Sequence, residues 1–376
     1  SACAQQEPKP DITIKSHSEL VLVPVLVRDH AGTAVPGLQA RDFLLQEDGQ
    51  ARSVIAVEEV HNAPETASSA APATAAPAAA GIRMQDTVIL VLDLVNTPTS
   101  DQERAKTQLV KYLETNGTPV PTTLLTVGRG GIHIRQRFTT DTAALRAALG
   151  RVEPEYHAEG GGMDGEFPLP HYKDPEAVVL ADRNAYAVAR QRGLNMCRAA
   201  LEVIGAWAVR IPGRKTLLWG SGSFPFAATD GQLLNRANVV MYPIDLRGNV
   251  NHFFDAATDI RAIDPIGYES RRLHVDGYWD LAQNNYRANL GDIEAMAAAT
   301  GGQPCRTNND PADCLAHALG DMQSYYLVSF RPEASTKPGW HKLKVEVRRA
   351  GVAVRARSGY FVETPRPAAA SVPAAK

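Results

Sequence analysis

One acidic residue, Asp93, stands where the sequence predicts the ligand-binding end of a strand. It follows a short, continuous apolar run, residues 87–92, within the segment DTVILVLDLVN. Such a run, rich in β-branched side chains, is typical of a strand buried on both faces at the centre of a parallel sheet. Ligands of these sheets bind beyond the carboxyl ends of the strands. Asp93 is therefore the first candidate for a residue that binds a ligand.

Two serines, Ser221 and Ser223, follow a second buried run, residues 215–219, and could act as nucleophiles. The letters GSGS around them do not match the G-x-S-x-G pattern of a nucleophile elbow, because the second glycine comes one position early. A serine hydrolase would also need a histidine and an acid at other strand ends, and Asp245 with a histidine of the following insertion is a crude option. Hydrolysis by Ser221 or Ser223 is therefore a minor alternative.

The cysteines favour a disulfide over a metal centre. Cys305 and Cys314 are spaced C-x8-C, and in an exported protein this closeness predicts a disulfide between them. Two independent buried thiols are the alternative. Cys197 lies on the apolar face of a predicted long helix and is interpreted as a small core side chain. No CxxC pair and no Cys/His spacing of a zinc site occurs in the sequence.

Two polar insertions carry side chains that could contact a partner. The longer one, residues 247–288, follows a predicted strand and contains several aromatic residues. Aromatic side chains beyond a strand end could anchor a partner, and packing of the loop onto its own domain is the alternative. The other insertion, residues 152–174, is acidic and Gly-rich and is interpreted as an exposed loop. The candidate binding residues are Ser223, Asp245, Arg247, Phe253, Phe254 and Trp279.

Composition and motifs argue against several classes of function. The chain of 376 residues has a formal charge of -2, with 44% hydrophobic and 21% charged residues. It therefore has the composition of a globular protein without a basic field to attract nucleic acid. The sequence contains no apolar run of about 18 residues, so it predicts no membrane-spanning helix. The sequence has neither a Walker A motif nor a G-x-G-x-x-G that opens a helix after the first strand. No motif therefore indicates nucleotide binding.

Alternating strand and helix signals place Asp93 and the serines on one sheet. The predicted strands are residues 87–93, 122–127, 132–138, 215–219, 239–245 and 303–306. Helical patterns lie between them, and Ser100 with Glu103 predicts a capping box at the start of the first helix. This alternation predicts an α/β fold with a doubly wound, mainly parallel sheet.

Both ends of the chain carry a two-residue periodicity, which is typical of antiparallel strands. Residues 11–61 hold too few strands to form a closed structure alone, and residues 324–363 hold three more. We therefore predict one β-sandwich built from both ends, with the α/β sheet inserted between its halves. An Ala/Pro-rich linker, residues 62–82, cannot bury enough surface to fold. The tail, residues 364–376, is predicted to be disordered.

The order of these elements resembles a von Willebrand factor type A (VWFA) domain. The likeness is carried by Asp93 at the end of the first strand, by KTLLWGSGSFP in the fourth-strand position and by VVMYPIDLRG in the fifth. The opening LVPVLVRDHAGTAVPGLQARDFLLQEDG and the closing YYLVSFRP, WHKLKVEV and VRARSGYF are similar to bacterial, especially acidobacterial, VWFA-related secreted proteins. The resemblance covers residues from about 12 to 362 and assigns residues 83–323 to the type A domain.

The resemblance implies a cation site, the metal-ion-dependent adhesion site of these domains. The family's first loop reads Asp-x-Ser-x-Ser, whereas this chain has DLVNT, in which only Asp93 and Thr97 match. The family's Asp after the fourth strand is replaced within the GSG that contains Ser221. A hard cation takes about six oxygen ligands, so the implied site for Mg²⁺ or Ca²⁺ is degenerate and consists of Asp93, Asn96, Thr97 and Ser221. The alternative is that Asp93 caps the following helix or accepts hydrogen bonds from neighbouring loops.

Together these features predict an exported, non-enzymatic protein that binds a protein or a cell-surface ligand. Binding would use the loops at the carboxyl ends of the sheet, with or without a cation, and a structural subunit of a cell-surface assembly is the alternative. Residues 1–10 are interpreted as a leader remnant, since Ala2-Cys3-Ala4 fits a signal-peptidase site, and Cys3 could equally carry a lipid anchor. Replacing Asp93 by Ala is expected to weaken binding with little loss of thermal stability.

Overall fold

The computed structural model describes residues 20–61, 86–155, 175–222, 224, 226, 230–246, 291–305, 311–333 and 336–362. Between residues 175 and 190 it describes the backbone, and among the side chains there only that of Val188. The predicted leader with Cys3, the linker 62–82, the tail 364–376 and most of both insertions lie outside the described residues. The same holds for Ser223, Arg247, Phe253, Phe254 and Trp279.

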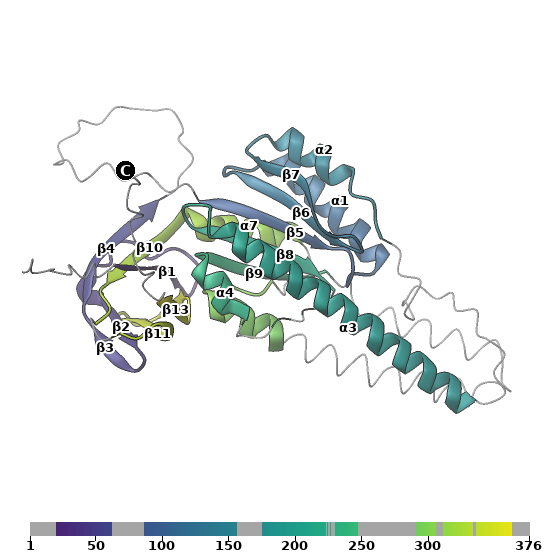
Figure 1. The fold of residues 1–376 in the computed structure, drawn as a ribbon. Helices are drawn as coiled ribbons and strands as arrows, with labels where there is room; N and C mark the ends of the chain where they lie inside the picture. Colours follow the sequence, from purple (N-terminus) through teal and green to yellow (C-terminus); the bar gives the residue numbers. More distant parts are fainter. Residues whose placement is uncertain are drawn as a thin grey trace, which may run out of the picture.

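A five-stranded sheet with the order β7-β6-β5-β8-β9 lies in the middle of the chain (Figure 1). Its strands are β5 (Thr87–Asp93), β6 (Thr122–Gly128), β7 (Gly131–Thr139), β8 (Lys215–Ser221) and β9 (Val239–Asp245). All except the antiparallel edge strand β7 run parallel and are buried along their whole length, as their continuous apolar runs predict. Of the strand predicted at residues 303–306, the described residues 303–305 make one parallel bridge, between Ile244 and Cys305.

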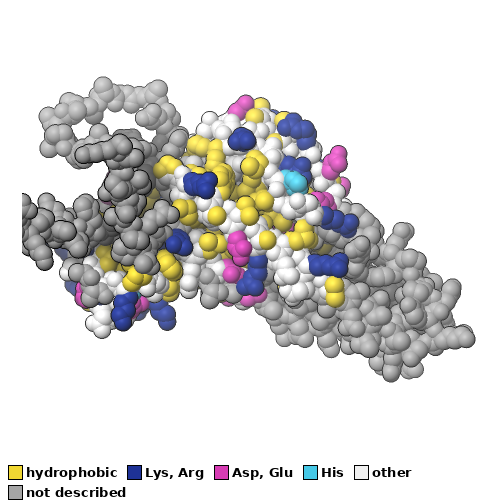
Figure 2. All heavy atoms as spheres, in the orientation of Figure 1, with side chains coloured by type: hydrophobic (Ala, Val, Ile, Leu, Met, Phe, Trp, Pro, Cys, Tyr) yellow, Lys and Arg dark blue, Asp and Glu magenta, His cyan; other side chains and the backbone are white. Residues whose placement is uncertain are grey.

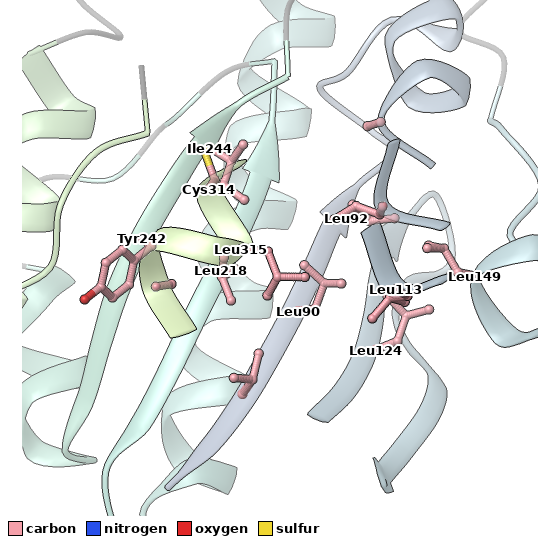
Figure 3. Packing of buried hydrophobic residues seen from close by; sticks show 14 of the residues in the cluster. Leu90, Leu92, Leu113, Leu124, Leu149, Leu218, Tyr242, Ile244, Cys314 and Leu315 are labelled. Carbon is pink, nitrogen blue, oxygen red and sulfur yellow. The ribbon is translucent and has the colours of Figure 1, made fainter. Parts of the chain in front are cut away.

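Helices cover both faces of this sheet. On one face α1 (Thr99–Asn116), α2 (Thr142–Gly150) and α7 (Pro311–Gln323) share an apolar cluster with Leu90 and Leu92 of β5 (Figure 3). On the other face α3 (Pro175–Ala208), α4 (Asp230–Arg236) and the helical residues 291–300 pack against Ile89 and Val91. Figure 1 shows the first half of α3 extending beyond the sheet. Alternate residues of β5 thus enter opposite cores, as the two-residue period of a strand requires, and the predicted α/β class with a mainly parallel sheet is confirmed.

The start of α1 differs from the prediction. The helix begins at Thr99 after the N-cap residue Pro98, which makes no side-chain cap hydrogen bond. Ser100 therefore lies inside the first turn, and the predicted capping box of Ser100 and Glu103 is wrong. A buried glutamine holds the preceding loop instead, because Gln102 Nε2 donates to the main-chain oxygens of Leu94 at 3.0 Å and Thr97 at 2.6 Å. Contacts made in the folded protein thus override the local capping signal.

The two ends of the chain form two antiparallel sheets, with the strand orders β12-β1-β10-β4 and β13-β11-β2-β3. The elements are β1 (Val21–Asp29), the 3-10 helix η1 (Ala40–Asp42), β2 (Phe43–Glu47), β3 (Gln50–Arg52), β4 (Val54–His61), β10 (Ser324–Phe330), β11 (Gly339–Val347), β12 (Val352–Ala356) and β13 (Gly359–Val362). Both sheets mix strands from before and after the parallel sheet, for example where Val21 pairs with Phe330 and Leu45 with Val345. The predicted pairing of the chain ends is therefore present.

We call these two antiparallel sheets the terminal module, and the described part of residues 86–323 the central module. One buried apolar cluster of the terminal module takes side chains from both sheets, including Val25 of β1, Phe43 of β2, Val328 of β10 and Leu343 of β11. The terminal module lies beyond the amino ends of the parallel strands (Figure 1). In the part of the chain that the structure describes, no helix is long and apolar enough to cross a membrane.

Candidate functional site

The carboxyl ends of β5 and β8 bring Asp93 and Ser221 together. Each is the last residue of its strand, and the two strands are adjacent and parallel, with Leu92 paired to Gly220. The side chains of Asp93 and Ser221 are both fully buried. The predicted juxtaposition of these two residues is therefore present, at the edge of the sheet where it was expected.

The Asp93 carboxylate accepts five hydrogen bonds from the protein. Its Oδ1 accepts from the main-chain N–H groups of Val95 at 2.9 Å and Asn96 at 3.1 Å. Its Oδ2 accepts from Asn96 Nδ2 at 2.8 Å, Ser221 Oγ at 2.6 Å and Cys197 Sγ at 3.1 Å. The donors come from the loop after β5, from the end of β8 and from α3. One buried carboxylate thus ties three elements together, and we call these contacts the Asp93 network.

Burial and hydrogen bonding act on the Asp93 pKa in opposite directions. Burial raises the pKa, while the hydrogen bonds from Ser221, Asn96 and Cys197 lower it, and the net shift is upward from the usual value. Burial also raises the pKa of the Cys197 thiol, and the neighbouring Asp93 charge adds to that shift. Cys197 therefore stays a protonated thiol and serves as a donor, in a place where the sequence predicted only a small core side chain.

Two glycines allow the chain to approach this network closely. A Cβ on Gly193 of α3 would lie 2.1 Å from Asn96 Oδ1, and a Cβ on Gly222 would lie 2.5 Å from the main-chain oxygen of Asn96. The N–H of Gly222 donates to Thr97 Oγ1 at 3.0 Å. The loop of residues 94–98 is therefore pressed between α3 and the end of β8, where a larger side chain at either glycine has no room.

The four residues implied as cation ligands lie together, but their arrangement does not fit a cation. Asn96 turns its amide nitrogen, a donor, toward Asp93. Turning the amide over would set its oxygen against the carboxylate, and the Cys197 and Ser221 donors would still occupy Oδ2. A hard cation needs about six oxygen ligands, and no group of three or more His, Cys, Asp or Glu suited to a metal occurs in the part of the chain that the structure describes. Hydrogen-bond donors fill the positions around Asp93 that a cation would occupy.

Of the six candidate binding residues, the structure describes only Asp245. It ends β9, is 5% exposed, and pairs in register with Ser221. The chain passes from there to Leu246, whose N–H donates to the Ser221 main-chain oxygen at 3.0 Å. Asp245 thus belongs to the same edge of the sheet as Asp93 and is largely shielded from solvent by its neighbours.

The predicted disulfide is absent from the structure, in which neither Cys305 nor Cys314 is linked to another described cysteine and both thiols are buried. Cys305 lies on the edge of the parallel sheet, where its N–H donates to the Pro243 oxygen, and Cys314 points from α7 into the apolar cluster beside Ile244 (Figure 3). Closeness in sequence does not bring two Cβ atoms to the separation that a disulfide needs. The alternative of two separate buried thiols is therefore the one observed, and export loses one of its two supports.

The arrangement around Ser221 does not resemble an activated nucleophile. The hydroxyl is fully buried and donates to a carboxylate, whereas a serine nucleophile needs a base such as histidine within hydrogen-bond reach and a path for substrate. The sequence offered no signal for the thiol donor Cys197 or for the close approach at Gly193. Both lie on α3, far along the chain from Asp93, so only the packing of α3 on the sheet reveals their role.

Comparisons with known proteins assign no family to the chain. No protein-family model matches it, and no curated protein matches it. Among solved structures, the chain is similar to one titled "Crystal Structure of the SpRpn10 VWA domain", with a TM-score of 0.20 and 8% identity over 42% of this chain and 88% of that chain. A TM-score this low carries no argument about function. The chain is therefore characterised by its own topology, a mainly parallel α/β sheet joined to two antiparallel sheets.

Proposed function

We propose that this chain is a non-enzymatic binding protein that presents the loops at the carboxyl end of its parallel sheet to a protein or cell-surface ligand, without a divalent cation at Asp93. One observation carries this proposal: the buried Asp93 carboxylate already accepts five hydrogen bonds from three elements. These bonds hold the loop 94–98 in place, a task that a cation would otherwise perform. A rigid loop loses little conformational freedom on binding and therefore favours affinity.

The mixed charges on the face shown in Figure 2 and the small net charge of the chain support a protein or polymer ligand better than nucleic acid. Figure 2 shows Lys and Arg side chains scattered among acidic and apolar ones over the described residues of one face, and the whole chain carries a formal charge of -2. Strong nucleic-acid binders gather basic residues on one face. The exposed Ser100 at the start of α1 lies next to the loop 94–98 and offers an accessible position from which to test this surface.

The terminal module supports the proposal as a rigid base. We infer that its two sheets face each other as a β-sandwich, because one apolar cluster contains side chains from both. Such a sandwich would hold the central module by its amino end and leave the carboxyl end of the parallel sheet available. Export to the periplasm, outer surface or medium is part of the same proposal and rests on the amino-terminal sequence alone.

Calorimetry tests the cation part of the proposal. Mg²⁺, Ca²⁺ and Mn²⁺ are titrated into chelator-treated protein, and we expect no saturable heat. Saturable binding that disappears in Asp93→Asn and persists in the control Asp141→Asn would overturn the metal-free site. A fluorophosphonate probe tests the enzyme alternative, since labelling of folded protein that is lost on Ser221→Ala would show an accessible nucleophile.

A pair of bulky substitutions on α1 tests the binding surface. Ser100 lies at the start of this helix and Thr115 near its end, and both are exposed. Immobilised wild type, Ser100→Trp and Thr115→Trp are exposed to cell-surface proteins and polysaccharides in the presence of EDTA. Retention that only Ser100→Trp reduces supports the proposed surface, whereas equal retention by all three contradicts it. Light scattering distinguishes the structural-subunit alternative, which predicts a mass that grows with concentration.

A further inference from the structure

A second polar cluster lies where the two modules meet, and it borders a small, partly open cavity. Arg214 immediately precedes β8 at the amino end of the parallel sheet, and Arg357 lies between β12 and β13 of the terminal module. The centre of a water-sized sphere can move within about 10 Å³ of this cavity. Its lining comes from both modules and includes Leu26 and Arg357 of the terminal module and Arg214 and Asn235 of the central module. None of the lining residues is acidic.

Arg214 is almost completely buried without a full set of partners. It is 2% exposed, and its guanidinium lies 4.8 Å from the centre of the Tyr325 ring. Its Nη1 donates to the main-chain oxygen of Asp321 at 3.4 Å, while Nε and Nη2 have no hydrogen-bond partner among the described residues. A buried guanidinium with unsatisfied donors is costly unless something accepts from them.

Arg357 approaches the same cavity from the terminal module. Its Nη1 donates to the Asn235 main-chain oxygen at 3.3 Å and its Nη2 to that of Leu22 at 2.7 Å. Its Nε has no hydrogen-bond partner in the described part of the chain. The side chain is half-buried, and burial lowers the pKa of Arg357 to about 10.

The neighbouring carboxylate of Asp321 is occupied by other donors. Its Oδ1 accepts from Arg28 at 3.1 Å, and its Oδ2 accepts from Arg355 at 2.6 Å and from the Tyr242 hydroxyl at 2.8 Å. It therefore cannot also neutralise the side chains of Arg214 and Arg357. The buried carboxylate of Asp86 also lies at this junction, where it accepts from the Tyr325 hydroxyl at 3.5 Å. Nε and Nη2 of Arg214 nevertheless remain without a hydrogen-bond partner among the described residues.

We propose that this cavity binds a monatomic anion of the size of chloride, held between the guanidiniums of Arg214 and Arg357. A space of about 10 Å³ for the centre of a water-sized sphere holds roughly one such particle, so a phosphate group or a nucleotide does not fit. The free donors Nε and Nη2 of Arg214 and Nε of Arg357 supply the contacts. An ordered water is the competing occupant, because the buried acceptor Asn235 Oδ1 also lacks a partner among the described residues.

An anion in this place would join the two modules. It would contact Arg357 from the terminal module and Arg214 from the central one. It would therefore link two segments that lie far apart in the sequence. A ligand that binds only the folded chain stabilises it in proportion to RT ln(1 + [L]/Kd). Chloride should therefore raise the melting temperature in a saturable way, beyond the general effect of ionic strength.

The experiment uses the whole chain at constant ionic strength, with sodium chloride or sodium bromide replacing sodium gluconate, whose anion is too large for the cavity. We expect a saturable rise in melting temperature in wild type and in the surface control Arg146→Met. In Arg357→Met the apparent affinity for chloride should fall about tenfold or more, as expected for the loss of a charge-assisted contact. Arg214→Met should abolish the effect if that variant folds.

Bromide provides a direct measurement that does not depend on the variants. Crystals soaked in bromide should show an anomalous peak between Arg214 and Arg357. An equal melting temperature in chloride and gluconate, or the absence of the peak, would identify the occupant as ordered water and overturn the proposal. A chloride effect that is unchanged in Arg357→Met would overturn it as well.

Discussion

The two ends of the parallel sheet solve the same problem, a buried charge, in opposite ways. At the carboxyl end a single carboxylate, Asp93, is surrounded by five donors, and none of the side chains that contact it has a fully buried polar atom without a partner among the described residues. At the amino end Arg28 and Arg355 donate to the Asp321 carboxylate and Arg214 donates to its main-chain oxygen, while Arg214, Arg355 and Arg357 keep N–H groups without partners among the described residues. The first cluster is complete without a ligand, whereas the second is not.

This difference changes the role of Asp93 from an expected cation ligand to a hydrogen-bond acceptor within the protein. The resemblance directed attention to Asp93 as a ligand-binding carboxylate, but its lone pairs are used within the protein. The unmatched polar groups lie at the other end of the sheet, where two modules meet. A buried charged group thus indicates ligand binding only when the neighbouring protein groups leave some of its donors or acceptors without a hydrogen bond.

Removing the Asp93 carboxylate should have the largest effect. In Asp93→Ala five donors, two of them fully buried, lose their acceptor. The free energy of unfolding should therefore fall by about 3–5 kcal/mol, which replaces the small loss of stability expected from the sequence. Urea unfolding measures this change. The control Asp141→Ala removes an exposed carboxylate that accepts from two main-chain N–H groups at the start of α2, and it should cost about 1 kcal/mol. Equal losses in the two variants would contradict a structural role for the Asp93 network.

Neutralising Asp321 should be the next largest perturbation. Asp321→Asn leaves Arg28 and Arg355 without their charged acceptor, and we expect a loss of about 2–3 kcal/mol in the free energy of unfolding. Water can reach this junction, because the Arg28 and Arg355 side chains are 16% and 23% exposed, so the loss should be smaller than for Asp93→Ala. The same variant increases the positive charge at the junction and should tighten chloride binding in the gluconate exchange experiment. Weaker chloride binding would speak against the proposed anion.

Individual donors of the Asp93 network should contribute unequally. Ser221→Ala removes a hydroxyl that donates to a carboxylate at 2.6 Å, and should cost about 1.5–3 kcal/mol. Cys197→Ser exchanges a thiol donor at 3.1 Å for a hydroxyl donor and should cost less than about 1 kcal/mol. Urea midpoints of the two variants decide the order. A larger loss for Cys197→Ser would mean that the volume of the sulfur, and not its hydrogen bond, matters at this position.

A buried lysine at the amino end should give a smaller, pH-dependent effect. Burial lowers the pKa of Lys215 from 10.5 to about 8, and its Nζ donates to the Ile211 oxygen at 2.7 Å. Below about pH 8 the lysine is protonated in both states. Between about pH 8 and 10.5 the unfolded chain holds a proton that the folded chain has lost, so the free energy of unfolding rises with pH.

Lys215→Met should remove that rise. The stability difference between wild type and Lys215→Met, measured by urea unfolding at several values between about pH 7 and 9.5, should move in favour of wild type as the pH increases. Comparing the two proteins cancels other groups that titrate in this range. A difference that does not change with pH would show that Lys215 is not a buried titrating group.

Much of the fold and part of the site follow from patterns that are local in the sequence. Continuous apolar runs identify the buried strands, and the alternating pattern of both chain ends identifies the antiparallel ones, because a strand presents successive side chains to opposite faces. The meeting of Asp93 with Ser221 also follows, since both terminate adjacent parallel strands. The sequence also left open that Asp93 accepts hydrogen bonds from neighbouring loops, and this alternative matches the structure.

Tertiary structure alone decided what surrounds each charge. The Cys197 thiol reaches Asp93 only because α3 packs closely through Gly193, and the thiols of Cys305 and Cys314 stay apart because sheet edge and helix hold them in separate places. Arg214 and Arg357 share a cavity because the chain ends return to the amino end of the sheet. Hydrogen bonds and charge compensation act over a few ångströms in space, whereas sequence patterns report periodicity along the chain, so the balance of donors and acceptors appears only in the folded protein.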